Sequence, residues 1–241
     1  MLDSFFDWIY PRKCIFCNEL LDFGSGSFIC SECGQSLDGL MIHPPCCEIC
    51  GSPLPTEGGS CPDCSEALFS FERNFSCFIY HDKIRDMIRG FKYKNKPGYA
   101  KSIASVLYRH FCDLPEFDGF VPVPLHNSRL KLRGYNQSAL LAEQLGKLYK
   151  KPVFYYLART RKTLPQNGLT AVERASNIAG AFALAGGVSC AGSTLFLVDD
   201  IFTTGGTLDA CAKVLVEGGA NKIYTMTIAK PEYRGSDRIT E

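Results

Sequence analysis

The stretch LFLVDDIFTTGGTL, residues 195–208, decides the fold of the larger part of this chain. Its apolar run is typical of a buried strand, and two carboxylates end that run. A loop of threonines and glycines follows and leads into TLDACAKVLVEGG (207–219), which has the spacing of a helix. Like charges side by side cost free energy unless a partner lies next to them. The stretch therefore predicts a strand, a loop that holds a ligand, and a helix.

Strands and helices alternate on both sides of this stretch. From the apolar patterning we expect strands at 75–80, 117–124, 152–158, 194–200 and 222–229, and helices at 82–92, 99–111, 136–150 and 207–219. Such alternation is typical of parallel strands joined by crossover helices. The sequence therefore predicts an α/β fold, a parallel sheet flanked by helices, whose ligands gather beyond the carboxyl ends of the strands.

The loop after the acidic pair has the chemistry of an anion site. Consecutive N–H groups, hydroxyls and small residues at the beginning of a helix favour a phosphate, although no Gly-Lys-Ser/Thr of a P-loop follows. The carboxylates suit hydroxyl groups beside that phosphate, so a ribose 5-phosphate fits. The alternative is an acidic pair that only caps the helix. The residues predicted to hold the ligand are Asp199, Asp200, Thr203, Thr204, Gly205, Gly206 and Thr207.

Cysteine pairs mark a separate module in the first quarter of the chain. The chain has 13 cysteines, and the first quarter holds four C-x-x-C pairs. Two such pairs can hold one zinc ion in a closed tetrahedron, which leaves no open position for catalysis. We therefore predict two structural Zn²⁺ sites with sequential pairing, Cys14, Cys17, Cys30 and Cys33, then Cys47, Cys50, Cys61 and Cys64. A cross-braced pairing is the alternative, and Cys46 could compete with Cys47.

Two other interpretations of these cysteines are weaker. A disulfide framework needs an oxidising compartment, whereas the N-terminus, MLDSFFDWIYPRK (1–13), carries acids where a secretory signal has a positive region. A redox dithiol lacks the thioredoxin-like pattern around it. Outside the pairs, Cys77, Cys112, Cys190 and Cys211 lie among apolar neighbours, so we expect them in the core.

Charge divides the chain at about the same place. Residues 1–75 carry 3 basic and 11 acidic side chains, whereas residues 76–241 carry 23 and 14. Opposite net charges favour two domains, a cysteine-rich zinc-binding module at 1–75 and a domain at 76–241 that meets an anionic ligand, although the halves could simply attract each other. No apolar run approaches the ~20 residues of a membrane span, so we expect a cytoplasmic protein.

Taken together, the motifs resemble one family. VDDIFTTGGT (198–207) is similar to the phosphoribosyl pyrophosphate signature of type I phosphoribosyltransferases. With the C-x-x-C pairs, VPVPLHNSRLKLRGYNQS (121–138) and PQNGLTAVERASNIAGAF (165–182), the chain resembles the ComF (competence protein F) family. In that family a cysteine-pair zinc module, like a double zinc ribbon, precedes a phosphoribosyltransferase-like domain. The motifs span most of the chain in the expected order.

The resemblance implies a role for each motif. Asp199 and Asp200 would hold the ribose hydroxyls, and the loop 203–207 would wrap the 5-phosphate. Arg129 and Arg133 would face the pyrophosphate. Mg²⁺ would be chelated by pyrophosphate and ribose oxygens, while positioning, water exclusion and neutralisation of the leaving group would provide catalysis.

A further stretch resembles the mobile loop that closes over the reacting centre in such enzymes. This polar stretch lies around Gln166, Leu169, Arg174 and Asn177. The predicted catalytic residues are Arg174, Asp199 and Asp200. The alternative is an exposed helix. Likewise, RLKLR (129–133) could be a solvated face or a contact for nucleic-acid phosphates. FKYKNK (91–96) could join the anion site, bind single-stranded nucleic acid or end a helix in solvent.

The resemblance thus implies a phosphoribosyltransferase that uses phosphoribosyl pyrophosphate and Mg²⁺ on an unidentified acceptor, with a link to natural competence and DNA uptake. The alternative is a non-catalytic module that senses a ribose phosphate and binds single-stranded DNA or DNA-processing proteins of the uptake machinery. The basic domain suits both hypotheses, and fold alone does not separate them.

Overall fold

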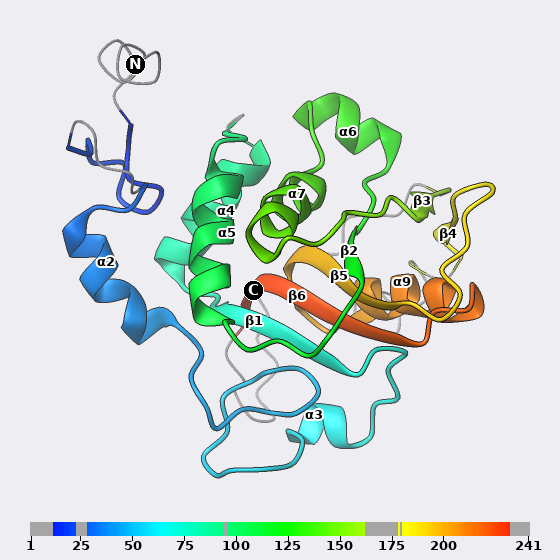
Figure 1. Cartoon of the computed structure of the whole chain (residues 1–241). Coiled ribbons are helices and arrows are strands. Elements are labelled where there is room, and N and C mark those ends of the chain that lie inside the picture. The colour runs from blue at the N-terminus through cyan, green and yellow to red at the C-terminus, as the bar shows by residue number, and fades with distance from the viewer. Residues whose placement is uncertain (1–11, 23–27, 94–95, 162–177, 179, 232–241) are drawn as a thin grey trace.

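The parallel sheet that the sequence predicts is present. The computed structural model describes residues 12–22, 28–93, 96–161, 178 and 180–231. In this part of the chain the main sheet has the order β1-β6-β5-β2, and every neighbouring pair is parallel (Figure 1). The strands are β1 (Arg73–Ile79), β2 (Gly119–Pro122), β5 (Thr194–Ile201) and β6 (Lys222–Lys230).

Strand β5 is buried on both faces because its apolar residues alternate between them. Phe196 and Val198 belong to the core on one face, while Leu195 and Leu197 belong to the core on the other. All four side chains are fully buried. A near-continuous apolar run is what a parallel strand covered on both sides requires.

Helices cover both faces of the sheet. The core that contains Phe196 also holds the apolar sides of α4, α5 and α7, and the core that contains Leu195 holds that of α9. Their bounds are α4 (Asp82–Tyr93), α5 (Tyr99–His110), α7 (Gln137–Tyr149) and α9 (Gly206–Glu217). In the described part of the chain, no helix combines the length and the apolarity that crossing a bilayer requires.

Residues 152–158 correct one expectation, because they do not form a strand of the main sheet. Val153 makes a single bridge to Phe120. The rings of Phe154 and Tyr156 stack on each other, 4.7 Å between centroids. The chain then forms β3 (Leu157–Arg159), which pairs antiparallel with β4 (Phe182–Leu184) outside the main sheet.

In the domain that contains the sheet, one helix of the described residues was not predicted. It is α6 (Asn127–Arg133), and it begins where His126 Nδ1 accepts a hydrogen bond from the N–H of Ser128 at 3.2 Å. It ends at Gly134, whose φ of 80° reverses the chain into α7. Helix α6 therefore lies between the end of β2 and the beginning of α7, on the carboxyl side of the sheet.

The cysteine-rich segment runs beside β1, which is an edge strand of the sheet. The N–H of Ile42 donates to the carbonyl of Cys77 at 2.8 Å, and the N–H of Asn74 donates to the carbonyl of Ile49 at 2.7 Å. The segment thus covers an edge that would otherwise expose unpaired backbone groups. It contains α2 (Ser31–Leu37), the 3-10 helix η1 (Asp38–Leu40) and α3 (Pro62–Ser65) (Figure 1).

Candidate functional site

The acidic pair ends β5 at the carboxyl edge of the sheet. Asp199 Oδ1 accepts hydrogen bonds from Ser138 Oγ and from the N–H of Asp200, each at 2.9 Å. Asp200 Oδ2 forms an ion pair with Lys92 Nζ. Each carboxylate therefore has its own partner, one from α7 and one from α4. These partners offset the repulsion between the two neighbouring charges.

Burial dominates the electrostatics of this pair. Desolvation raises the pKa of Asp199, although Lys92 and Ser138 act against the shift. Desolvation also lowers the pKa of Lys92 to about 8, while Asp199 acts to raise it. The Lys92 ammonium contacts Asp200, and the negative charge of Asp199 favours it as well. It therefore interacts with both carboxylates. At neutral pH this lysine still carries its charge.

The loop that follows the acidic pair turns sharply into α9. Gly205 has a φ of 78°, and a Cβ on this residue would lie 2.8 Å from Phe202 Cζ and 3.0 Å from a ring carbon of Phe69. Only glycine suits this position. No side chain caps the beginning of α9, and Thr203 and Thr204 are exposed beside it. The positive end of the α9 dipole and these exposed hydroxyls therefore favour an anion here.

Arginine side chains surround the acidic pair. Arg133 donates from Nη1 to Gln137 Oε1 at 2.9 Å and from Nη2 to the Tyr93 hydroxyl at 3.0 Å. Arg129 lies close enough to lower the pKa values of Lys92 and Arg159, after the larger effect of desolvation on each. Arg159 in turn acts to lower the pKa of Asp199. Lys92, Arg133 and Arg159 thus favour the charge of Asp199, and Arg129 lies near Lys92 and Arg159.

The structure brings most of the predicted ligand-binding residues to one edge of the sheet. Asp199, Asp200 and the loop 203–207 lie there, with Arg129 and Arg133 opposite on α6 and at its end. Arg174 and its neighbours Gln166, Leu169 and Asn177 lie outside the described residues.

Two residues of the site were not predicted, and one was placed among alternatives. Ser138 lies in the first turn of α7, after the Asn136 cap. A helix that begins at the ligand-binding edge of a sheet directs its first residues there, and that signal could have identified Ser138. No sequence pattern points to Arg159. Of the alternatives for Lys92, the structure excludes the solvated helix end, because its side chain is 18% exposed and ion-paired.

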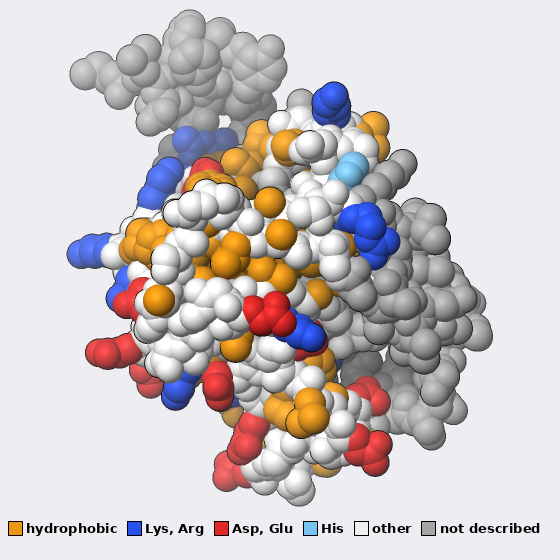
Figure 2. Space-filling model, turned by 90° about the vertical axis from the view of Figure 1, so that its right-hand side faces the viewer, with side chains coloured by type: hydrophobic (Ala, Val, Ile, Leu, Met, Phe, Trp, Pro, Cys, Tyr) orange, Lys and Arg blue, Asp and Glu red, His pale blue; other side chains and the backbone are white. Residues whose placement is uncertain are grey.

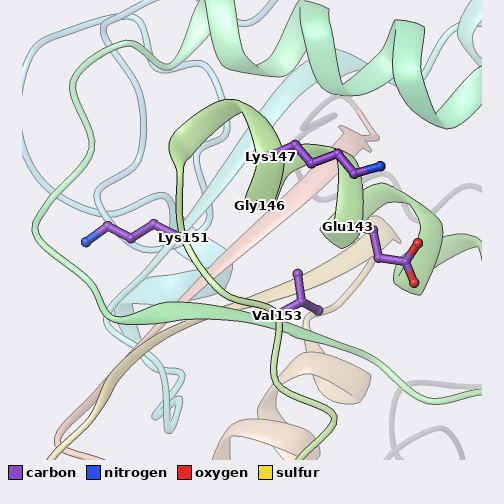
Figure 3. A pocket seen from close by; sticks show the side chains of 5 residues that line it. All are labelled: Glu143, Gly146, Lys147, Lys151 and Val153. Atoms are coloured by element: carbon purple, nitrogen blue, oxygen red, sulfur yellow. The ribbon is translucent and has the colours of Figure 1, made fainter.

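A hollow on the surface of the protein lies away from this edge. It has a volume of about 410 Å³ and is lined by Glu143, Gly146, Lys147, Lys151 and Val153 (Figure 3). These residues belong to the last turns of α7 and to the chain beside the beginning of β2, whereas Ser138 in the first turn of the same helix contacts Asp199. The hollow is therefore not part of the candidate site.

The cysteine pairs form two clusters in the predicted sequential pairing. Within each cluster the four Sγ atoms lie within 4.8 Å of one another. The Sγ atoms of Cys17 and Cys30, and those of Cys50 and Cys61, are 3.6 Å apart. Zn–S bonds of about 2.3 Å place the sulfurs of a tetrahedron about 3.8 Å apart, so both clusters fit zinc. Cys46 is outside them, since its Sγ donates to the carbonyl of His43 at 3.1 Å.

The two clusters are copies of one local structure. In each, the N–H of the residue after the second cysteine donates to the carbonyl of the first, Asn18 to Cys14 and Gly51 to Cys47, both at 3.0 Å. These residues have φ values of 65° and 73°. Cys30 and Cys61 each precede a short helix, α2 and α3. The two pairs of C-x-x-C motifs therefore repeat not only the cysteine spacing but also the backbone conformation.

Backbone N–H groups prepare the clusters for metal. Burial alone would raise the pKa of Cys47, but the N–H groups of Cys50 and Cys61 outweigh it and lower the pKa to about 7. Cys14 is lowered to about 7 in the same way. Each cluster thus has a thiol that ionises near neutral pH, and the resulting thiolate is the form of cysteine that binds zinc. Of the remaining cysteines, Cys112 corrects our expectation: it is exposed because it lies beyond the end of α5.

The second cluster lies beneath the loop that leads into α9. Its four cysteines share a core with Phe71, Phe202 and Leu208. The rings of Phe69 and Phe71 stack at 4.7 Å, and Phe71 meets the edge of Phe202 at 6.1 Å. The N–H of Ser70 donates to Asp209 Oδ1 at 2.6 Å in the first turn of α9. Residues that follow the zinc cluster therefore support the loop directly.

Charge on the surface follows the division seen in the sequence. Figure 2 shows Lys and Arg side chains mainly in the upper half of one face and Asp and Glu side chains mainly in its lower half. In Figure 1, with the same vertical axis, α6 lies at the top and α3 of the cysteine-rich segment at the bottom. The basic half of this face is thus at the level of α6, which carries Arg129 and Arg133.

A family model and several relatives match this chain. The model of the double zinc ribbon domain matches residues 5–65, which include both cysteine clusters. The chain is 28% identical to DNA utilization protein YhgH of Escherichia coli, over 91% of this chain and 97% of the relative. It is also 28% identical to competence protein ComFC of Bacillus subtilis, over 84% of each.

Solved phosphoribosyltransferase structures share a lower similarity. The glutamine phosphoribosylpyrophosphate amidotransferase of B. subtilis is 18% identical with a TM-score of 0.37, over 59% of this chain and 27% of that one. A hypoxanthine phosphoribosyltransferase of Staphylococcus aureus is 15% identical with a TM-score of 0.33, over 61% and 70%. The α/β assignment of this chain follows from its own strand order.

One further relative matches nearly the whole chain in sequence. The chain is 30% identical to competence protein F of Haemophilus influenzae over 228 residues, which make up 90% of this chain and 96% of the relative. The chain belongs to the competence protein F family.

Proposed function

We propose that this protein binds phosphoribosyl pyrophosphate with Mg²⁺ at the carboxyl end of β5 and transfers the phosphoribosyl group to an acceptor. The observation that carries the proposal is the meeting of Asp199 and Asp200 with the glycine-turned loop before α9, among four cations. The names of the relatives, competence protein F and DNA utilization protein, support a task in DNA uptake. We place that task in the cytoplasm.

The residues divide the ligand among them. The carboxylates of Asp199 and Asp200 accept hydrogen bonds from the 2- and 3-hydroxyls of the ribose. The residues from Thr203 to Thr207, with the N–H groups at the beginning of α9, hold the 5-phosphate. Arg129 and Arg133 face the pyrophosphate, for which guanidinium groups are suitable donors. The boundary near residue 75 separates this site from the zinc module, whose role is structural.

Transfer breaks the bond between the anomeric carbon and the pyrophosphate, and the acceptor forms the new bond to that carbon. Positive charge develops on the ribose ring beside Asp199 and Asp200, while negative charge develops on the leaving group beside Arg129 and Arg133. Oxygen donors suit Mg²⁺, which when bound supplies further neutralisation of the pyrophosphate. Arg174 belongs to the stretch that closes over the site and excludes water.

Pyrophosphate release tests the transfer step. The zinc-loaded protein is incubated with phosphoribosyl pyrophosphate, Mg²⁺ and a panel of nucleobases, nucleosides and DNA oligonucleotides as acceptors. At least one acceptor should stimulate release, and Arg174→Ala should reduce release roughly 100-fold while the ligand still binds. Turnover that survives Arg174→Ala removes the closing role from this residue. Absence of release with any acceptor, in a protein that binds the ligand, leaves the second function below.

The second function is a non-catalytic ribose-phosphate sensor that binds single-stranded DNA. The observation that favours it is Tyr93, whose ring is 64% exposed and lies 4.7 Å from the Arg133 guanidinium. An exposed ring beside a cation is what base stacking on single strands requires. Binding of an oligonucleotide that weakens with salt and is lost in Tyr93→Ala, without pyrophosphate release, would support the sensor over the enzyme.

A further inference from the structure

Lys92 occupies a position that packing alone would give to an apolar residue. In α4 the side chains of Ile84 and Ile88 are fully buried against the sheet, and Lys92 continues the same stripe at the next i,i+4 position. Its side chain is 18% exposed, and that of its partner Asp200 is 9% exposed. Buried charges are costly, and buried pairs are often replaceable by apolar residues without loss of stability. A role at the site explains the lysine better than stability does.

The ion pair uses the oxygen that a ligand needs. Lys92 Nζ contacts Asp200 Oδ2, and Asp200 Oδ1 already accepts from the N–H of Ile201 at 3.1 Å. Asp200 Oδ2 is itself buried, so a ribose hydroxyl can reach this oxygen only if the ammonium beside it moves away. The displaced ammonium then needs another anion, because leaving it buried and unpaired is costly.

A diphosphate is the anion that the surroundings favour. Arg129 and Arg133 face Lys92 closely enough to lower its pKa, so the three cations border one region. Among the described groups, these three cations outnumber the two carboxylates of Asp199 and Asp200. This excess is not neutralised by the two carboxylates and suits a ligand that carries several negative charges.

We propose that Lys92 holds Asp200 in the ligand-free protein and is passed to the pyrophosphate when the ribose hydroxyls bind. The proposal rests on the function proposed above and adds a basis for specificity. Ribose 5-phosphate displaces the ammonium from Asp200 but offers it no diphosphate. Phosphoribosyl pyrophosphate displaces the ammonium and also offers it a diphosphate. Lys92 therefore makes tight binding depend on the diol and the diphosphate together.

The ligand-free part of the proposal is tested by a double-mutant cycle. Thermal unfolding midpoints are measured for wild type, Lys92→Met, Asp200→Asn and the double variant, with Lys83→Met as the control, an exposed lysine on the same helix. Each single substitution should lower the midpoint by leaving one buried group unpaired, and the double variant should recover most of the loss. Losses that simply add would show that the pair is not coupled and would overturn the proposal.

The exchange itself is tested by comparing two ligands. Lys92→Met should weaken the binding of phosphoribosyl pyrophosphate with Mg²⁺ by ~10- to 100-fold. The same variant should bind ribose 5-phosphate as well as wild type or better, since no ammonium has to leave Asp200. Lys92→Arg should restore part of the preference for the diphosphate. A similar loss for both ligands would assign Lys92 a purely structural role and overturn the exchange.

The two tests separate failure of this inference from failure of the proposed function. If wild type binds neither ligand, the proposed function fails and the exchange fails with it, whatever the cycle shows. If wild type and Lys92→Met bind phosphoribosyl pyrophosphate equally, the proposed function stands and the exchange does not. Lys83→Met should match wild type in both tests.

Discussion

At the scale of single residues, the candidate site places charge where folding alone would avoid it. Asp199 accepts a hydrogen bond from Ser138, and Asp200 is ion-paired with Lys92. Burial opposes the charge of Asp199 and that of Lys92. Sites that must bind a ligand often retain such costs. The sequence showed the acidic pair, but not its partners, because Lys92 and Ser138 come from helices that only the folded chain brings to β5.

Removing the charge of Asp199 should stabilise the ligand-free protein. Burial raises the pKa of this carboxyl in the folded state, so folding favours its protonated form. The associated stability is fully present below the unfolded pKa of about 4 and is lost as the pH rises through the folded pKa. Asp199→Asn should therefore raise the unfolding midpoint at pH 7 by ~2–4 °C, with the gain vanishing toward pH 4.

Thermal scans between pH 4 and pH 8 measure this effect. Asp113→Asn, at an exposed aspartate, is the control and should leave the midpoint unchanged. A midpoint for Asp199→Asn that lies below wild type at every pH would mean that the charge stabilises the fold.

Gly205 should be more sensitive to substitution than another glycine with the same backbone conformation. Gly205 and Gly187 have φ values of 78° and 77°, but only a Cβ at Gly205 would meet Phe202 and Phe69. Gly187→Ala should cost about 1 kcal/mol of unfolding free energy, from the φ angle alone. Gly205→Ala should cost more, because the rings must also move. Urea unfolding measures both, and equal losses would show that the rings yield freely.

At the scale of elements, apolar periodicity predicted those parts of the fold that have one continuous buried face. The apolar run of β5 and the stripe of α4 are examples, and each element lies within two residues of its predicted position. Helix α6 lacked such a stripe, because Leu130 and Leu132 are two residues apart and are 38% and 80% exposed. Residues 152–158 were predicted as one strand from their apolar patterning, but Val153 makes only a single bridge to β2, and the chain joins β3 only from Leu157.

The zinc clusters were predictable as elements because their spacing is itself the signal. Cys61→Ser should reduce the zinc content from two ions per chain to one, since Cys61 is one of four sulfurs in the second cluster. Cys46→Ser is the matched control, because this neighbouring cysteine donates to a carbonyl outside the cluster. Metal analysis of the purified variants gives both numbers. Loss of zinc in Cys46→Ser, or two ions in Cys61→Ser, would contradict the ligand assignment.

At the scale of the whole molecule, the second zinc cluster and the candidate site share one core. Phe71 and Phe202 connect them, and Ser70 is hydrogen-bonded to the first turn of α9. The first cluster contributes to the other core through Ile15, on the face of the sheet that carries α4. This arrangement is absent from the sequence pattern, since it depends on contacts between residues about 140 positions apart.

Loss of the second cluster should therefore affect the ligand more than loss of the first. Cys61→Ser should weaken the binding of phosphoribosyl pyrophosphate by ~10-fold or more, because the loop before α9 loses the support beneath it. Cys17→Ser, which removes one sulfur of the first cluster, should have a smaller effect. Calorimetric titration of both variants makes the comparison. Equal effects would mean that zinc acts only through overall stability.

The measurement that tests the central claim most directly is calorimetric titration of phosphoribosyl pyrophosphate with Mg²⁺ into the zinc-loaded protein. It compares wild type, the double variant Asp199→Asn/Asp200→Asn, and Asp113→Asn as the control. We predict saturable binding to wild type and to Asp113→Asn, and loss of binding in the double variant. Absence of binding to the folded, zinc-loaded wild type, or unchanged binding in the double variant, would contradict the assignment of this site.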